Sequence, residues 1–310
     1  MLDEKFELLI CIDNNYLMPT EIWLYNLYRN TPPEVLANLR VRLGYFGGQL
    51  SFENIEKLKT LSQLIGIELL PQEENLEGVL FPDSFSASHL PVTAFIRIKF
   101  IFSLQNSFIY MDVDTLLSPG WHEIFTEMNR LVELGKPIAA VKDMWIQFGA
   151  RPDTTMEFLK PDSAFEYLTY GYFNSGIMVV NPKALAGHSF QEALDILPSI
   201  KENHSIVWDQ DVLNALFFAE VHFLENTYNF MACDPFLWNL AANILRNQTP
   251  KIIHYVNLSK PWSSNMMPGM LDEYRDTVLG LNCERPFLLA HRKYLYAIYE
   301  YETFRRINGM

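Results

Sequence analysis

Two aspartates and a distant histidine are the residues of this chain that could together bind a metal ion. Asp112 and Asp114 follow the apolar stretch 107–111, which predicts a buried strand ending at them. Side chains alternate along a strand, so both carboxylates should share one face while Val113 turns into the core. Two carboxylates this close repel each other unless a cation lies between them. Oxygen ligands suit Mg²⁺ or Mn²⁺, and an added imidazole from His254 favours Mn²⁺.

A divalent ion at this position would neutralise a nucleoside diphosphate and stabilise it as a leaving group. Each motif also has a purely structural explanation. Aspartate is common in turns and caps, and His254 could end a strand with its hydrogen bonds satisfied. Residues 260–262, Lys-Pro-Trp, could form a loop with a packed tryptophan, and residues 173–176, Phe-Asn-Ser-Gly, a tight turn into a strand. The order in which the motifs occur favours the chemical interpretation.

This order of motifs resembles that of the retaining glycosyltransferases of family 8, which include bacterial lipooligosaccharide galactosyltransferases and glycogenin. The resemblance extends from about residue 6 to about residue 262. It implies a GT-A fold, an α/β architecture with a Rossmann-like, mostly parallel sheet flanked by helices. The implied activity is transfer of glucose or galactose from a UDP-sugar to an acceptor hydroxyl, on a bacterial surface saccharide, with Mn²⁺ or alternatively Mg²⁺ as cofactor.

The resemblance also implies a role for each matching residue. Asp112, Asp114 and His254 would bind the metal ion, and Lys260 would bind the diphosphate. Asp209 and Gln210 would flank the reacting carbon, and retention through a covalent intermediate or through same-face attack both stay open. The other implied donor-binding residues are Asp13, Asn15 and Tyr16 at the uracil, Arg97 and Asn174 near the sugar, and Val113 and Asn257.

Two departures from the family pattern leave other functions open. Asn257 replaces a usual glycine, and asparagine is the residue that best tolerates left-handed φ after glycine. Pro91, two residues after His89, replaces a common serine and suits the first turn of a helix. A non-catalytic nucleotide-sugar or glycan-binding relative is the main alternative. A metal-dependent nucleotidyltransferase or phosphohydrolase would share the paired aspartates but would not explain His254 or residues 260–262.

Strands and helices should alternate along the chain and position these motifs. Apolar runs and helical spacing predict strands over 6–12, 41–46, 67–70, 107–111, 137–141 and 177–180, and helices after residues 19–20, from 51 and over 209–219. The helix that begins at residue 51 should bury an apolar stripe formed by Ile55, Leu58, Leu61 and Leu64. This β-α-β alternation predicts a parallel sheet that binds a nucleotide at its carboxyl edge. Residues 72–88 are predicted to form a loop, either near the donor or fully solvated.

Residues 1–280 are predicted to form the catalytic domain and residues 281–310 a helical tail. Residues 285–310 hold five basic side chains, two acidic ones and several aromatic residues. Such a helix could lie on an anionic membrane surface, where lipid-linked acceptors are found. Packing of its tyrosines back onto the domain, or onto a dimer partner, explains the composition equally well.

Composition limits the remaining classes of function. The net charge of −13 disfavours a nucleic-acid partner. Cys11, Cys233 and Cys283 lack metal-site spacing and fit a reducing compartment, with Cys11 in a strand core. No secretory signal or spanning segment is evident, so we expect a soluble cytoplasmic protein, with peripheral contact at the inner membrane surface as the alternative. Residues 234–239 are candidates for acceptor contacts. Acceptor identity, linkage and oligomeric state do not follow from the sequence.

Overall fold

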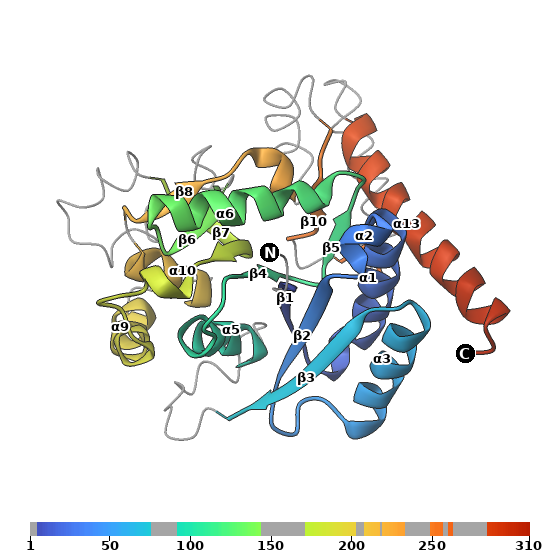
Figure 1. Ribbon diagram of the computed structural model, residues 1–310, viewed down its shortest axis with the longest axis horizontal. Coiled ribbons are helices and arrows are strands. Elements are labelled where there is room, and N and C mark those ends of the chain that lie inside the picture. The colour runs from blue at the N-terminus through green and yellow to red at the C-terminus, as the bar shows by residue number, and fades with distance from the viewer. Residues whose placement is uncertain are drawn as a thin grey trace.

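A twisted central sheet with helices on both faces dominates the molecule (Figure 1). The computed structural model describes residues 5–75, 92–143, 171–202, 208–217, 219–232, 249–256, 260–262 and 284–310. The predictions for His89, Pro91, Asn257, residues 76–88 and residues 234–239 lie outside these ranges.

Seven strands form the central sheet in the order β3-β2-β1-β4-β7-β6-β8. Among the described strands of this sheet, β7 alone runs opposite to the others. The prediction of a mostly parallel sheet is therefore confirmed. The strands are β1 (Phe6–Cys11), β2 (Leu39–Phe46), β3 (Glu68–Glu74), β4 (Phe108–Met111), β6 (Ile138–Lys142), β7 (Phe173–Val180) and β8 (Val221–Phe223).

Strand β1 lies between β2 and β4, so the strand order reverses at the β1–β4 pair. Open α/β sheets bind ligands in the crevice at the carboxyl ends of the strands that flank such a reversal. Asp13 follows β1 and Asp112 follows β4, and both therefore reach this crevice. Because β7 is antiparallel, its first residues, which include Asn174, enter the sheet at the same edge.

Alternating side chains give the sheet two apolar faces. Leu8 and Ile10 of β1 join a core with α1, α3 and α6, whereas Leu9 joins a second core with α5, α9 and α10. The helices are α1 (Leu17–Asn30), α2 (Pro33–Leu36), α3 (Phe52–Leu64), α5 (Val92–Ser103), α6 (Ile124–Leu134), α9 (Phe190–Glu202), α10 (Trp208–Leu216) and α13 (Glu284–Ile307).

A second sheet, in the order β5-β10-β9, joins distant parts of the chain. Its strands are β5 (Thr115–Leu117), β9 (Phe230–Met231) and β10 (Ile252–His254). Strand β10 pairs antiparallel with β5, and His254 lies opposite Thr115. This pairing brings His254 beside Asp114, although 140 residues separate the two in sequence.

Helix α13 packs back onto the body of the molecule. One face of α13 is buried, and it consists of Ala290, Tyr294, Ala297 and Tyr301. The hydroxyl of Tyr255, which directly follows β10, donates to the carbonyl of Ala290 at 2.6 Å. Figure 1 shows α13 running alongside α1.

Some predicted boundaries were wrong. Helix α1 begins at Leu17, before Pro19, because proline fits the first turn of a helix. Strand β3 continues to Glu74 instead of giving way to a loop at residue 72, because its register with β2 extends to the Phe46–Glu74 pair. Residues 173–176 form a strand and not a turn, and α10 ends at Leu216, short of the predicted end of the 209–219 helix. Leu64, the last residue of α3, was predicted to belong to the apolar stripe but is 48% exposed and lies outside the buried face.

Candidate active site

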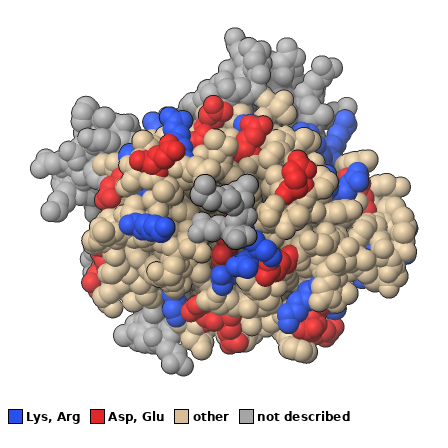
Figure 2. Space-filling model, in the orientation of Figure 1, with Lys and Arg blue, Asp and Glu red and all other residues tan. Residues whose placement is uncertain are grey.

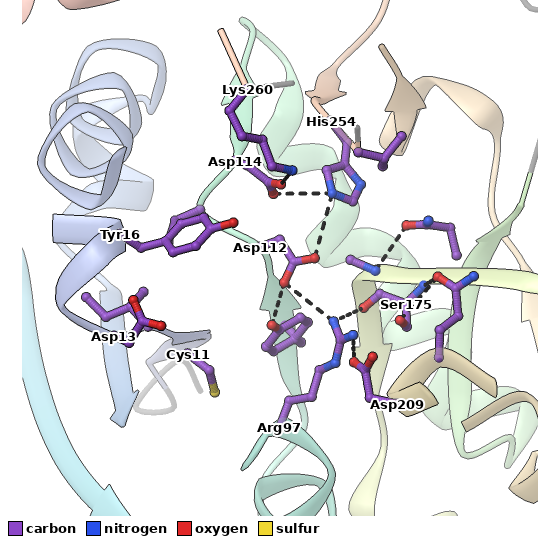
Figure 3. Close-up of a pocket in the computed structure, with 17 residues that line it drawn as sticks. Cys11, Asp13, Tyr16, Arg97, Asp112, Asp114, Ser175, Asp209, His254 and Lys260 are labelled. Atoms are coloured by element: carbon purple, nitrogen blue, oxygen red, sulfur yellow. Dashed lines mark hydrogen bonds and ion pairs between the residues drawn. The ribbon is translucent and has the colours of Figure 1, made fainter. Parts of the chain in front are cut away.

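A pocket of about 190 Å³ lies at the carboxyl ends of β1 and β4 (Figure 3). Segments from across the chain contribute its walls. It is lined by Cys11, Ile12, Asp13, Tyr16, Arg97, Tyr110, Asp112, Val113, Asp114, Asn174, Ser175, Gly176, Asp209, Gln210, His254, Val256 and Lys260. The structure therefore brings together every predicted site residue that it describes, with the exception of Asn15.

Asp112, Asp114 and His254 present one ligand atom each within 4.8 Å of one another. Nε2 of His254 lies 3.7 Å from Oδ2 of Asp112 and 3.3 Å from Oδ1 of Asp114. Ligand atoms that share one ion at about 2.1 Å in octahedral geometry lie roughly 3 Å apart. Oδ1 of Asp114 is also buried and accepts no hydrogen bond from the described residues. These observations fit a divalent cation held by the three residues.

The strand predicted before the two carboxylates is present as β4, but the extended alternation predicted for Asp112, Val113 and Asp114 is not. Strand β4 ends at Met111, so Asp112, Val113 and Asp114 lie in the connection to β5 rather than in an extended strand. Val113 nevertheless belongs to the core, as predicted, and it also lines the pocket. The connection turns both carboxylates towards His254.

Lys260 lies against Asp112, Asp114 and His254, the candidate metal-ligand cluster. Its Nζ donates to Oδ2 of Asp114 at 2.5 Å and to the carbonyl of Tyr255 at 2.7 Å. Burial alone would raise the pKa of Asp114, but Lys260 and His254 outweigh it and hold this pKa well below its usual range. Asp114 is thus ionised and available as a ligand.

Asp112 is in a less favourable environment for its charge. Burial raises its pKa, Arg97 opposes this effect, and the nearby charge of Asp114 adds to it. Oδ1 of Asp112 accepts a hydrogen bond from the hydroxyl of Tyr110 at 2.5 Å and another from Nη1 of Arg97 at 3.4 Å. These contacts leave Oδ2 facing His254 (Figure 3).

Arg97 contacts Asp112 after β4, Ser175 of β7 and Asp209 of α10. From α5 its guanidinium donates to the carbonyl of Ser175 at 3.1 Å and forms an ion pair with Asp209 of α10. The side chain of Arg97 is 6% exposed and that of Asp209 is 4% exposed, so both charges are buried and paired. Arg97 therefore presents a fixed positive charge beside the metal-ligand cluster.

Buried amide groups line the wall of the pocket beside Arg97 and Ser175. Oε1 of Gln210 accepts from the backbone N–H of Ser175 at 3.0 Å, and its Nε2 donates to Oδ2 of Asp143 at 3.1 Å. Nδ2 of Asn174 donates to the same Asp143 oxygen at 3.3 Å. The side-chain amide of Gln210 is thus held at both ends.

Three residues that shape the site were not predicted from the sequence: Asp143, Gly176 and Asn229. Asp143 comes two residues after the end of the predicted strand 137–141, close to the position relative to a strand that identified Asp112. Gly176 belongs to the 173–176 motif, but no role was assigned to it. Asn229, which hydrogen bonds to His254, has no recognisable sequence signal.

Gly176 allows two of the candidate metal ligands, His254 and Asp112, to approach each other. A Cβ atom at this position would lie 2.1 Å from Cε1 of His254 and 2.7 Å from Oδ2 of Asp112. Real Cβ atoms essentially never approach other atoms so closely. Only glycine therefore leaves room for the cluster as it stands.

The expected uracil-binding residues follow β1. Asp13 caps the short 3₁₀ turn Asn14–Tyr16, and its Oδ1 accepts the backbone N–H of Asn15 at 2.8 Å. Asp13 and Tyr16 line the pocket, whereas the side chain of Asn15 is exposed and does not. The ring of Tyr16 meets that of Trp262 edge to face at 6.1 Å. Trp262 in turn contacts Tyr294 of α13.

Comparison with known proteins relates this pocket to a family. Residues 7–266 match the family model described as "Glycosyl transferase family 8". The chain is 24% identical over 290 residues to General stress protein A of Bacillus subtilis (strain 168), and the match covers 88% of this chain and 92% of that protein. It is also 24% identical over 265 residues to a putative glycosyltransferase of Haemophilus influenzae (strain ATCC 51907 / DSM 11121 / KW20 / Rd), covering 84% and 73%.

Solved structures share the fold. The galactosyltransferase LgtC, solved in complex with donor and acceptor sugar analogs, superposes with a TM-score of 0.66 at 17% identity, covering 92% of this chain and all of that one. The glycosyltransferase GlyE of Streptococcus pneumoniae TIGR4 gives 0.56 at 19% identity, covering 95% and 64%. At these identities the likeness shows a common architecture.

Proposed function

The chain belongs to glycosyltransferase family 8, as its motifs predicted, and we propose that it transfers glucose or galactose from a UDP-sugar to an acceptor hydroxyl with retention at the anomeric carbon. One observation carries the proposal. Three residues of metal-ligand type and Lys260 converge on a single pocket at the β1–β4 reversal. A paired-carboxylate hydrolase would not need this combination of a metal cluster and a lysine.

Asp112, Asp114 and His254 would hold Mn²⁺, or alternatively Mg²⁺. When bound, the ion supplies positive charge that stabilises UDP as the bond to the sugar breaks. Lys260 adds a second positive charge beside Asp114, in the position expected of a diphosphate-binding lysine. The buried charge of Arg97 provides a third.

The sugar would lie beside Arg97 and the buried amide groups. Asn174 and Asp209 would contact its hydroxyl groups, and Gln210 would flank the reacting carbon. Because Gln210 is hydrogen bonded through both its oxygen and its nitrogen, it presents a fixed amide to the donor. Same-face attack assisted by the leaving phosphate and a covalent intermediate on Gln210 or Asp209 remain the two routes to retention.

Product analysis tests this function. The protein is incubated with UDP-glucose or UDP-galactose and a saccharide acceptor, with and without Mn²⁺, and UDP and the sugar product are measured. We expect metal-dependent release of UDP together with transferred sugar. Bound UDP without turnover would instead identify a nucleotide-sugar-binding protein. Release of pyrophosphate or phosphate would identify the nucleotidyltransferase or phosphohydrolase class.

The outer face of α13 is where we propose membrane contact. Arg292, Lys293, Tyr296, Tyr299 and Arg306 are exposed and lie outside the buried face. Basic and aromatic side chains on one exposed helix face suit an anionic lipid surface. None of the helices in the described ranges combines the length and apolarity needed to cross a membrane.

Charge reversal on this face should weaken binding to anionic vesicles. We expect the triple variant Arg292→Glu, Lys293→Glu and Arg306→Glu to sediment less with phosphatidylglycerol vesicles, because each basic residue near such a surface contributes about 1 kcal/mol. Deletion of the helix is a poor test, since its inner face contacts Tyr255.

Basic side chains also occur elsewhere on the surface, interspersed with acidic ones (Figure 2). A matched control therefore reverses Lys57, Lys59 and Arg130, which lie on α3 and α6. Equal sedimentation of the two triple variants would contradict a specific role for α13.

A further inference from the structure

Asn229 is a buried residue next to the metal-ligand cluster that has had no role so far. It is 1% exposed and directly precedes β9, which pairs in parallel with β10. This pairing places its side chain against His254, and Oδ1 of Asn229 lies 3.0 Å from Nδ1 of the imidazole. The contact is on the side of the ring that faces away from Asp112 and Asp114.

The orientation of the Asn229 amide can be deduced from the backbone N–H of Gly176, which is connected to Asn229 through the side chain of Asn174. The backbone N–H of Gly176 can only donate, so the Asn174 atom that it contacts at 3.0 Å must be the oxygen Oδ1. The Asn229 atom that lies 2.9 Å from this oxygen must then be the donor Nδ2. The remaining polar atom of Asn229, the one that faces His254, is therefore the oxygen.

An oxygen at this place determines which nitrogen of His254 carries a proton. Nδ1 must donate to Asn229, so the neutral imidazole has its proton on Nδ1 and a free lone pair on Nε2. Nε2 is the atom that faces Asp112 and Asp114. The opposite neutral tautomer would place a proton where a metal ion must bind.

We propose that Asn229 is a positioning residue that fixes the tautomer and the ring orientation of His254 for metal binding. The proposal rests on the metal site of the proposed function. Histidine ligands generally need such a partner on their second nitrogen, and its loss typically lowers metal affinity 10- to 100-fold.

The same series of hydrogen bonds continues from Asn174 through Asp143 to Gln210, but loss of Asn229 should affect only its His254 end. Asn174 and Gln210 both donate to Asp143, while Gln210 is also held by the N–H of Ser175. Loss of the Asn229 side chain would free His254 and leave both contacts of Gln210 in place. The metal site should therefore weaken, while the hydrogen bonds that hold Gln210 stay intact.

Metal affinity is the first measurement. Mn²⁺ is titrated into protein without donor, and free Mn²⁺ is followed by electron paramagnetic resonance. We expect Asn229→Leu to weaken Mn²⁺ binding roughly 10- to 100-fold. Asn229→Asp, whose carboxylate can still accept from Nδ1, should recover most of the affinity. Asn181→Leu is the control, because this buried asparagine lies at the other end of β7 and should leave the affinity unchanged.

The tautomer of His254 is the second measurement and needs no metal. Protein labelled with ¹⁵N-histidine is compared with a His254→Ala sample, which assigns the His254 signals among the seven histidines. We expect a protonated Nδ1 and an unprotonated Nε2 in the wild type and in Asn229→Asp, and loss of this preference in Asn229→Leu. If the wild type carries its proton on Nε2 and none on Nδ1, the proposal is overturned, and no Asn229 variant has to be measured.

The two measurements separate the possible failures. If the wild type binds no Mn²⁺, the proposed metal site fails, whereas the tautomer still tests what Asn229 does to His254. If the wild type binds Mn²⁺ and Asn229→Leu binds it equally well with an unchanged tautomer, the role of Asn229 is overturned.

Discussion

Replacing Asp114 with asparagine is expected to abolish the stabilisation of the protein by UDP and Mn²⁺. A ligand that binds only the native state raises the free energy of unfolding by about 2.7 kcal/mol at a hundredfold excess over its Kd. Asparagine keeps the shape of Asp114 but removes the charge that faces His254 and Lys260. Melting curves with UDP, with and without Mn²⁺, measure the loss, and UDP release should fall at least about 10²-fold.

The fold should survive the change at Asp114. Lys260 loses one ion pair, the one with Asp114, and keeps its hydrogen bond to the carbonyl of Tyr255. Glu123→Gln provides a matched control, because it removes the carboxylate that pairs with Lys251 at 2.7 Å outside the pocket. Turnover by Asp114→Asn at the level of this control would contradict the metal assignment.

Gly176→Ala should also destroy the proposed metal site, although it adds only one methyl group. The new Cβ would collide with His254 and Asp112, which converge on the backbone of Gly176. Inserting a methyl into such a close-packed place costs about 1–3 kcal/mol of stability. We expect a lower melting temperature and no measurable Mn²⁺ binding in the titration described for Asn229.

A double variant isolates the cause of this loss. In the His254→Ala background the ring that Gly176→Ala meets is absent, so the same methyl group should cost less stability than it does in the wild type. Contacting residues show coupling energies of about 0.5–3 kcal/mol in such cycles. An equal cost in both backgrounds would mean that the clash with His254 is not what destabilises the protein. Native-like Mn²⁺ binding by Gly176→Ala alone would show that the backbone moves aside.

The sequence predicted the parts of the site that depend on local pattern. The apolar run before Asp112 marked a strand end at the ligand-binding edge, and this placement needs only short-range information. The motif that contains His254 was identified by resemblance, but its place beside Asp114 depends on the β5–β10 pairing, which joins residues 140 positions apart. Local periodicity carries no information on such a pairing.

The residues that were missed act through packing and through hydrogen bonds between buried side chains. Asn229 reaches His254 because β9 pairs with β10, and β9 is a two-residue strand, too short for a pattern to reveal. The role of Gly176 appears only when the distances from a hypothetical Cβ are measured. Asp143 was within reach of the strand-end argument, since it follows a strand that was predicted nearly in full.

The contacts of α13 also bear on the order in which the protein acquires its ligand site during synthesis. Synthesis proceeds from the N-terminus, and a domain generally folds as a unit. The paired carboxylates Asp112 and Asp114 are made long before Lys260, and Tyr294 of α13, which packs against Trp262, comes later still. A growing chain therefore carries two adjacent negative charges without their lysine counter-charge. Because the domain folds as a unit, the pocket gains the charge of Lys260 only after residue 260 has been made, and the contact of Trp262 with Tyr294 forms later still.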